Sequence, residues 1–300
     1  MSSTRSLRIG PLNFLCATGP EFPSLEPTGL YASFFDTEPS GLSEGSLVTT
    51  SVIIDSGETA GPDRPADFEA GGHWKFWRDE EELVFATGYG ERTKPERLCR
   101  VTSDLRCVRL WVHPRALKAK PLPAHIAFPL SYPLDQILAW GLLSRMGGLL
   151  LHAAVAERKD GTAILLAGRS GAGKSTLSAL CADAGWSILN DDRALVYFRD
   201  DRVLVAGTPW HGSGRYAVPR TVPLKGILFL NQAGENRLET LDRASLLTEL
   251  LQVTSLPLFL DEWATPVFAA LNSLAASVPM QRFHFVRDSS AVERLAAERM

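Results

Sequence analysis

The residues with the clearest chemistry form one short segment that ends in a lysine and a serine. It reads Gly168-Arg169-Ser170-Gly171-Ala172-Gly173-Lys174-Ser175, followed by Thr176. This is the Gly-x-x-x-x-Gly-Lys-Ser pattern of a phosphate-binding loop, in which glycines let backbone N–H groups point at an anion and the next helix adds its positive N-terminus. In such a loop Lys174 reaches the β- and γ-phosphates, and the hydroxyl of Ser175 holds Mg²⁺. The segment lies between an apolar run at 163–167 and a helix-forming run at 176–184, which is the strand–loop–helix context that the motif requires.

Two adjacent acids, Asp191 and Asp192, follow a short strand predicted at 186–189. Ligands of α/β sheets collect at the carboxyl ends of strands, so we expect this pair beside the γ-phosphate. One carboxylate would accept the proton of an attacking hydroxyl, and the other would help to hold magnesium. The alternative is a solvated turn, of the kind that we also predict at 200–201.

His152 lies in the middle of an apolar strand predicted at 149–156. A single histidine in such a strand is more often a satisfied core residue than a functional one, so its position alone predicts no site. An Asp-Gly turn at 160–161 joins this strand to a second one at 162–167. The strand that enters the loop is therefore predicted to have an antiparallel neighbour.

The length of 300 residues suggests about two domains. We predict a smaller β-rich N-terminal domain over 1–113, a proline-rich connection over 114–133, and the domain with the loop over 134–300. Trp74 and Trp77 are expected in a core or an interface. The N-terminal strands are predicted at 31–35, 47–54, 73–77, 83–87 and 108–112. In the C-terminal part we predict helices at 134–146, 245–253, 263–276 and 291–299, and further strands at 194–198, 203–206, 223–230 and 280–286.

The composition excludes several classes of protein. Hydrophobic residues make up 45% and charged residues 22% of the chain, and the net charge is −3. These values are ordinary for a soluble globular protein and give no reason to expect nucleic acid as a partner. We find no signal-peptide core and no apolar run of membrane-spanning length, so no membrane partner is expected. The four cysteines form no Cys-x-x-Cys pair, which argues against a zinc or disulfide framework and favours the cytoplasm.

The order of Leu-His152-Ala-Ala, hairpin, glycine-rich loop and Asp191-Asp192 resembles the catalytic domain of HPr kinase/phosphorylase and its relatives. ATP-dependent phosphoenolpyruvate carboxykinase shares that nucleotide-binding core. The resemblance covers about 134–286 and is strongest over 149–196. It implies an α/β fold with a P-loop core and a mixed sheet, and ATP and Mg²⁺ as ligands. It also implies Asp191 as general base or acid, Asp192 as its acidic companion near the metal, and His152 as a group that orients the acceptor or the transferred phosphoryl.

The chain departs from this family after the two acids. The family carries a Glu-Ile-Arg-Gly type of signature there, whereas the present chain has Gly-Thr-Pro-Trp-His-Gly-Ser-Gly-Arg-Tyr at 207–216. The glutamate is missing. Arg215 either takes the place of the family's arginine or is a surface residue, and His211 either contacts substrate or shapes the loop. Neither the HPr protein nor oxaloacetate therefore follows as the substrate.

In size the chain is more similar to HPr-kinase-like enzymes of peptide-modification clusters, including lasso-peptide precursor kinases. We therefore predict a phosphotransferase that acts on a hydroxyl, most simply a serine, of a peptide or small protein. Relatives often assemble, so the resemblance also allows a homo-oligomer. Two alternatives stay open: a nucleotide sensor or scaffold without transfer, and a kinase of a small metabolite such as free serine.

A second motif would indicate a different function. The run Leu-Phe-Leu-Asp-Glu at 258–262 resembles a Walker B strand, which would make the chain an ATPase of the transporter or mechanical type. Pro257 precedes the run and Pro266 follows it, which favours a loop or the start of a helix. No Leu-Ser-Gly-Gly-Gln signature accompanies it.

Overall fold

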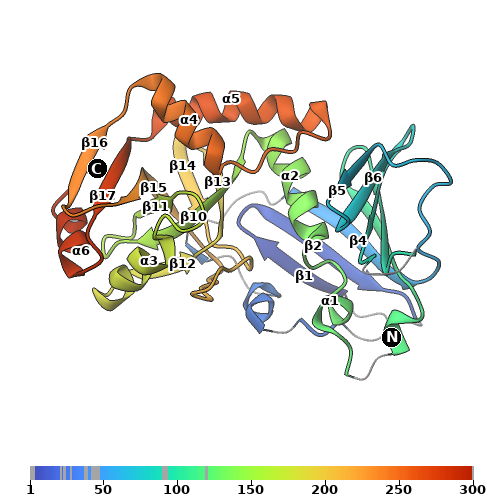
Figure 1. Ribbon diagram of the computed structural model, residues 1–300. Coiled ribbons are helices and arrows are strands. Elements are labelled where there is room, and N and C mark those ends of the chain that lie inside the picture. Colours follow the sequence, from blue (N-terminus) through green and yellow to red (C-terminus); the bar gives the residue numbers. More distant parts are fainter. Residues whose placement is uncertain are drawn as a thin grey trace. The chain divides into compact units, whose positions relative to one another are not determined.

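The computed structural model describes residues 4–20, 22, 25–27, 29–36, 40–41, 48–89, 94–118 and 121–298 (Figure 1). It is a mixed α/β protein with two mixed sheets. The chain forms two compact units: Met1–Thr37 with Ser46–Leu142, and Glu38–Gly45 with Leu143–Met300. The division falls inside helix α2 (Leu134–Met146), whereas the sequence placed it at residue 133.

The first unit is built on an eight-stranded sheet with the order β1-β2-β4-β9-β8-β7-β6-β5. Strand β4 pairs in parallel with both β2 and β9, and the other neighbours are antiparallel. The strands are β1 Thr4–Ile9, β2 Leu12–Thr18, β4 Val48–Ser56, β5 Phe68–Ala70, β6 Trp74–Arg78, β7 Glu82–Thr87, β8 Arg97–Thr102 and β9 Cys107–Val112. The helical segments are η1 Gly29–Phe34, η2 Ala116–Lys118 and α1 Ala124–Ala127, together with the first part of α2.

One strand predicted for this unit is wrong. The aromatic run at 31–35 lies mostly in the 3₁₀ helix η1, which begins at Gly29 with φ of +61°. Phe34 is buried, and the ring of Phe35 meets that of Phe128 edge-on at 4.9 Å between centroids. Tertiary packing of the aromatic rings thus overrides the β propensity of the run. The burial predicted for Trp74 and Trp77 is confirmed.

The proline-rich segment is not an extended connection. It contains η2 and α1, and its carbonyls at Pro129 and Tyr132 accept hydrogen bonds from the guanidinium of Arg97, at 2.8 and 3.0 Å. Arg97 is only 3% exposed, and a buried guanidinium needs such partners. Proline-rich backbone leaves carbonyls free to supply them, which ties this segment to the first unit.

The second unit is built on a nine-stranded sheet with the order β11-β10-β13-β14-β15-β17-β16, in which β12 also pairs with β10, β3 with β15, and β11 with β15. Its strands are β3 Ser40–Gly41, β10 Leu149–Glu157, β11 Ala163–Ala167, β12 Ser187–Asn190, β13 Arg193–Arg199, β14 Arg202–Ala206, β15 Arg220–Gln232, β16 Arg237–Thr240 and β17 Met280–Phe285. Its helices are α3 Lys174–Asp183, α4 Arg243–Val253, α5 Asp261–Ser277 and α6 Ser289–Ala296. The predicted hairpin is confirmed, because β10 and β11 pair antiparallel.

Helices cover both faces of this sheet. Alternate residues of β10 and β11, such as Leu151 and Leu165, pack in one core with α4 and α5. The residues between them, such as Ala154 and Leu166, pack in a second core with α3 and α6 (Figure 1). Strands buried on both faces have continuous apolar sequences, which is why β10 and β11 were recognisable.

The acidic pair at 261–262 opens helix α5 and belongs to no strand. The expected helix start is confirmed, and the chain holds these acids in the first helical turn, where they complement the helix dipole. None of the helices in the described part of the chain has the length and apolar character that crossing a bilayer demands.

We predict that Leu165→Ala lowers the free energy of unfolding by about 2–5 kcal/mol, because Leu165 is fully buried in the core beneath the site. Leu258→Ala is the matched control, since Leu258 is 63% exposed, and it should change stability by less than about 0.5 kcal/mol. Urea unfolding of both variants measures the difference. Equal losses would show that the core around β11 is not packed as described.

Candidate functional site

The site is assembled where three strands of the second unit end. Strand β15 pairs in parallel with β11 on one side and with β17 on the other. Their carboxyl ends therefore lie at the same edge of the sheet. The loop after β11, the last residue of β15 and the segment after β17 meet there.

The glycine-rich loop, residues 168–175, follows β11 and runs into the first two residues of α3, and the predicted strand–loop–helix context is confirmed. Gly171 and Gly173 have φ of +83° and +104°, in the left-handed range that favours glycine. A Cβ on Gly173 would lie 2.6 Å from Cζ of Phe285, so no larger residue fits there. At these two positions the loop thus presents only backbone to the space at the start of α3.

Lys174 is the first residue of α3 and is 8% exposed. Its Nζ donates to the carbonyl oxygens of Gly168 at 2.7 Å and Arg169 at 3.3 Å. Burial lowers the pKa of Lys174, against an opposing attraction to Asp192. The ammonium group has no carboxylate hydrogen-bond partner among these contacts, so its charge is only partly compensated.

His152 and Asp192 form a pair beside the glycine-rich loop. Nε2 of His152 lies 3.0 Å from Oδ1 of Asp192, and both side chains are about one-third exposed, at 29% and 32%. Burial alone would raise the pKa of Asp192, but the hydrogen bond from His152 and the charges of Arg193 and Lys174 hold it below its ordinary value. His152 is therefore not a satisfied apolar-core residue, because it faces an ionised acid.

Asp191 has a different environment from its neighbour. It is 3% exposed, and its two carboxylate oxygens accept from the backbone N–H groups of Gly212 at 2.7 Å and Gly214 at 2.6 Å. The two acids lie in the bend between β12 and β13, and they face different partners. Asp191 holds a loop, whereas Asp192 keeps Oδ2 without a hydrogen bond in the described part of the chain.

Two further residues complete the site, and the sequence did not reveal them. Gln232, the last residue of β15, donates from Nε2 to the carbonyl of Gly171 at 2.9 Å, and its Oε1 accepts from Arg287. Arg287 follows β17, is exposed, and has no carboxylate within ion-pair distance among the described residues. Only the parallel pairing of β15 and β17 could have indicated them, and long-range pairing is not visible in a single sequence.

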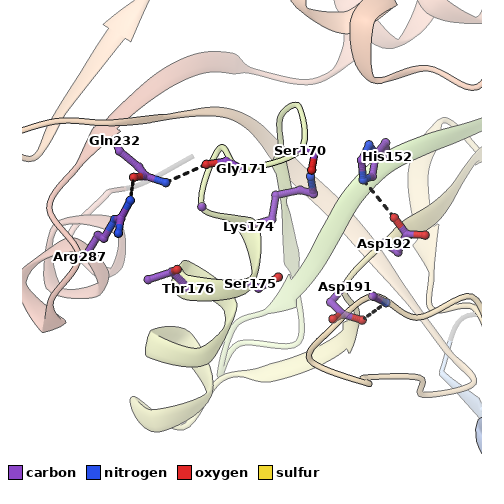
Figure 2. A pocket seen from close by; sticks show the side chains of 12 residues that line it. His152, Ser170, Gly171, Lys174, Ser175, Thr176, Asp191, Asp192, Gln232 and Arg287 are labelled. Atoms are coloured by element: carbon purple, nitrogen blue, oxygen red, sulfur yellow. Dashed lines mark hydrogen bonds and ion pairs between the residues drawn. The ribbon is translucent and has the colours of Figure 1, made fainter.

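These groups enclose a cavity of about 380 Å³ (Figure 2). Figure 2 shows the His152–Asp192 pair at one end, Lys174 in the middle, and Gln232 with Arg287 at the other end. The cavity is lined by His152, Ser170, Gly171, Gly173, Lys174, Ser175, Thr176, Asp191, Asp192, Gly212, Gln232 and Arg287. One space therefore has the acids at one end, Lys174 in the middle and Arg287 at the other end.

Several residues singled out in the sequence lie outside this lining. His211 and Arg215 are exposed on the loop at 207–219, and Nδ1 of His211 lies 2.9 Å from the carbonyl of Gly212. Arg169 points elsewhere, since its Nε donates to Gln252. Gly168 and Ala172 shape the loop without lining the cavity. The cation that does line it beside the loop lysine is Arg287.

The oxygen and nitrogen donors present fit a phosphate ester and a hard cation. The left-handed glycines form a backbone cradle, and Ser175 and Thr176 add hydroxyls to it. In the described part of the chain no three His, Cys, Asp or Glu residues gather as metal ligands. A divalent cation here would depend on hydroxyls, water and the oxygens of its own ligand, which is the pattern typical of Mg²⁺.

Comparison with known proteins finds a matching family model and distantly similar solved structures. The family model described as "SynChlorMet cassette protein ScmC" matches residues 137–286, which is half of the chain. Among solved structures, the HPr(Ser) kinase/phosphatase from Coxiella burnetii is similar at 16% identity, covering 49% of this chain and 93% of that one, with a TM-score of 0.29. The HPr kinase resemblance that the motifs indicated is thus found again, at a level too low to support any functional argument. No curated protein matches the chain.

We predict that Asp192→Asn makes unfolding less dependent on acid. The folded state lowers the pKa of Asp192, so its carboxylate contributes stability above the unfolded pKa of about 3.9 and loses it as the pH falls through the lower folded value. Wild type should therefore lose more unfolding free energy between pH ~6 and pH ~3 than the variant does. Urea unfolding at the two pH values measures this, and identical losses would contradict the His152–Asp192 pairing.

Proposed function

The chain belongs to the SynChlorMet cassette protein ScmC family, and from this premise and the site we propose that it is a Mg²⁺- and ATP-dependent phosphotransferase acting on a hydroxyl group. The observation that carries the proposal is the shared cavity. The glycine-rich loop, Lys174 and the His152–Asp192 pair line one space, so a bound triphosphate and an acceptor would meet there.

At the end of the cavity where the phosphates would bind, the proposal rests on positively charged side chains and backbone N–H groups. The N–H groups of the glycine-rich loop, Lys174 and Arg287 would hold the phosphates, and Ser175 would hold the metal. Bound Mg²⁺ would neutralise charge on the phosphoryl oxygens. Phosphoryl transfer needs little covalent help, so this positioning and electrostatic stabilisation would supply most of the rate.

The sequence led us to expect Asp191 as the general base, but the geometry at the end of the cavity where the acceptor would bind favours its neighbour. Both oxygens of Asp191 are engaged by backbone N–H groups, whereas Asp192 is held by His152 through Oδ1 and its Oδ2 accepts no hydrogen bond from the described residues. We therefore assign proton acceptance to Asp192. The acceptor oxygen bonds to the γ-phosphorus, the bond from that phosphorus to the bridging oxygen breaks, ADP leaves, and the hydroxyl proton passes to Asp192. This assignment replaces the metal role that the resemblance gave to Asp192.

The acceptor proposed is a serine of a peptide or small protein. The family description as a cassette protein fits an enzyme whose substrate is another product of the same cassette. The first unit would serve as a docking module, since its sheet ends in the edge strand β5, to which an extended peptide could add a strand.

Incubation with γ-labelled ATP and a serine-containing peptide library tests this function. Wild type should label a peptide. Lys174→Ala should abolish labelling with the fold retained, because the cavity loses its central cation. Asp192→Asn should keep nucleotide affinity and lower transfer by ~10²-fold or more.

The same assay separates the alternatives. Nucleotide binding without any labelled product would support a sensor or scaffold and overturn the transferase. Labelling of free serine but of no peptide would replace the acceptor class. A loss of Mg²⁺-nucleotide affinity in Asp192→Asn, with transfer per bound nucleotide unchanged, would return Asp192 to the metal.

We further predict that Arg287→Ala weakens ADP binding about tenfold, since it removes a charge-assisted hydrogen bond to a phosphate. Arg243→Ala is the matched control, because Arg243 is exposed at the start of α4 and does not line the cavity. Isothermal titration calorimetry compares the two variants with wild type. Unchanged affinity in Arg287→Ala would remove this arginine from the phosphate site.

A further inference from the structure

The loop at 207–219 connects β14 to β15 and carries a Gly-Ser-Gly sequence at its tip, Gly212-Ser213-Gly214. The two glycines are the residues whose N–H groups donate to the buried carboxylate of Asp191. A carboxylate that is 3% exposed depends on such donors, so the contact fixes the loop at two points on either side of Ser213.

The packing around both glycines leaves little room for a larger residue at either position. A Cβ on Gly214 would lie 2.8 Å from Oδ2 of Asp191 and 2.7 Å from the ring of Tyr216. A Cβ on Gly212 would lie 3.1 Å from the same carboxylate oxygen. The Gly-Ser-Gly tip therefore lies close against Asp191 because glycines flank the serine.

This arrangement brings two serine hydroxyl groups close together. Oγ of Ser213 lies 3.1 Å from Oγ of Ser175, at the start of α3. Ser175 is the residue whose type and position in the loop motif fit a magnesium ligand. The hydroxyl brought to it comes from a segment 38 residues further along the chain.

We propose that Ser213 is a second protein ligand of the divalent cation that accompanies the nucleotide, supplied by the loop that Asp191 fixes. This inference rests on the proposed function and adds a residue to its metal site. Two oxygens in adjacent octahedral positions, each about 2.1 Å from Mg²⁺, lie about 3.0 Å apart. The separation of the two serine oxygens matches that geometry, and both hydroxyls keep lone pairs for a metal.

A neutral hydroxyl has a specific consequence for the cation. It contributes no charge, so it binds Mg²⁺ more weakly than a carboxylate would, and the metal would depend more on the phosphate oxygens. The ion should therefore bind together with the nucleotide and only weakly to the protein alone. In this account Asp191 is a positioning residue, because it acts on the metal only through the loop.

The test is the Mg²⁺ dependence of ADP affinity, measured by calorimetry on the full chain. Ser213→Ala should raise the Mg²⁺ concentration for half-maximal tightening about tenfold and leave metal-free ADP affinity unchanged. Ser213→Thr keeps the hydroxyl and should behave as wild type. Ser213→Cys should lose Mg²⁺-dependent tightening and regain it with Zn²⁺, which thiolates prefer.

The outcomes are distinguishable. If wild type shows no ADP binding, the proposed function fails and this inference fails with it. If wild type binds with Mg²⁺ dependence and Ser213→Ala shows the same dependence, the function stands and the ligand assignment is overturned. Equal weakening of metal-free and metal-bound ADP in Ser213→Ala would also overturn it, since that pattern indicates a loop of structural importance only.

Discussion

The arrangement of the site depends on one buried carboxylate. Asp191 is withdrawn from solvent and accepts two short hydrogen bonds from backbone N–H groups of the 207–219 loop. An ionised acid in that position would be costly without them, so the carboxylate and the loop stabilise each other. With both oxygens of Asp191 engaged by the loop, the neighbouring Asp192 is the acid that pairs with His152.

Parallel strand pairing positions the residues at the other end of the cavity. Strand β15 lies between β11 and β17, so residues that are far apart in the sequence reach one edge. Gln232 links the two contributions, because it donates to the glycine-rich loop and accepts from Arg287. The backbone of the loop is thus connected to the segment after β17 by side-chain hydrogen bonds.

The sequence predicted the parts of the site that are local. The loop, the hairpin before it and the position of the two acids follow from short patterns, and β10, β11 and α3 lie close to their predicted bounds. The different environments of Asp191 and Asp192 could not be predicted, because they depend on a loop about 20 residues away whose conformation is set by packing. The contribution of Arg287 could not be predicted either, because it depends on the order of the strands in the sheet. In the first unit, the aromatic run at 31–35 has strand-like composition, yet ring packing against Phe128 draws it into a 3₁₀ helix.

The electrostatics of Lys174 explain why such a cavity would favour an anion. Its ammonium group is buried against two carbonyl oxygens, and burial lowers its pKa. Asp192 attracts it but is itself engaged by His152. Folding therefore already removes the lysine from water, and its contacts in the folded protein compensate only part of that free-energy cost. A phosphate entering the cavity would compensate a charge already removed from water, and the favourable interaction would exceed that of an exposed lysine with the same anion.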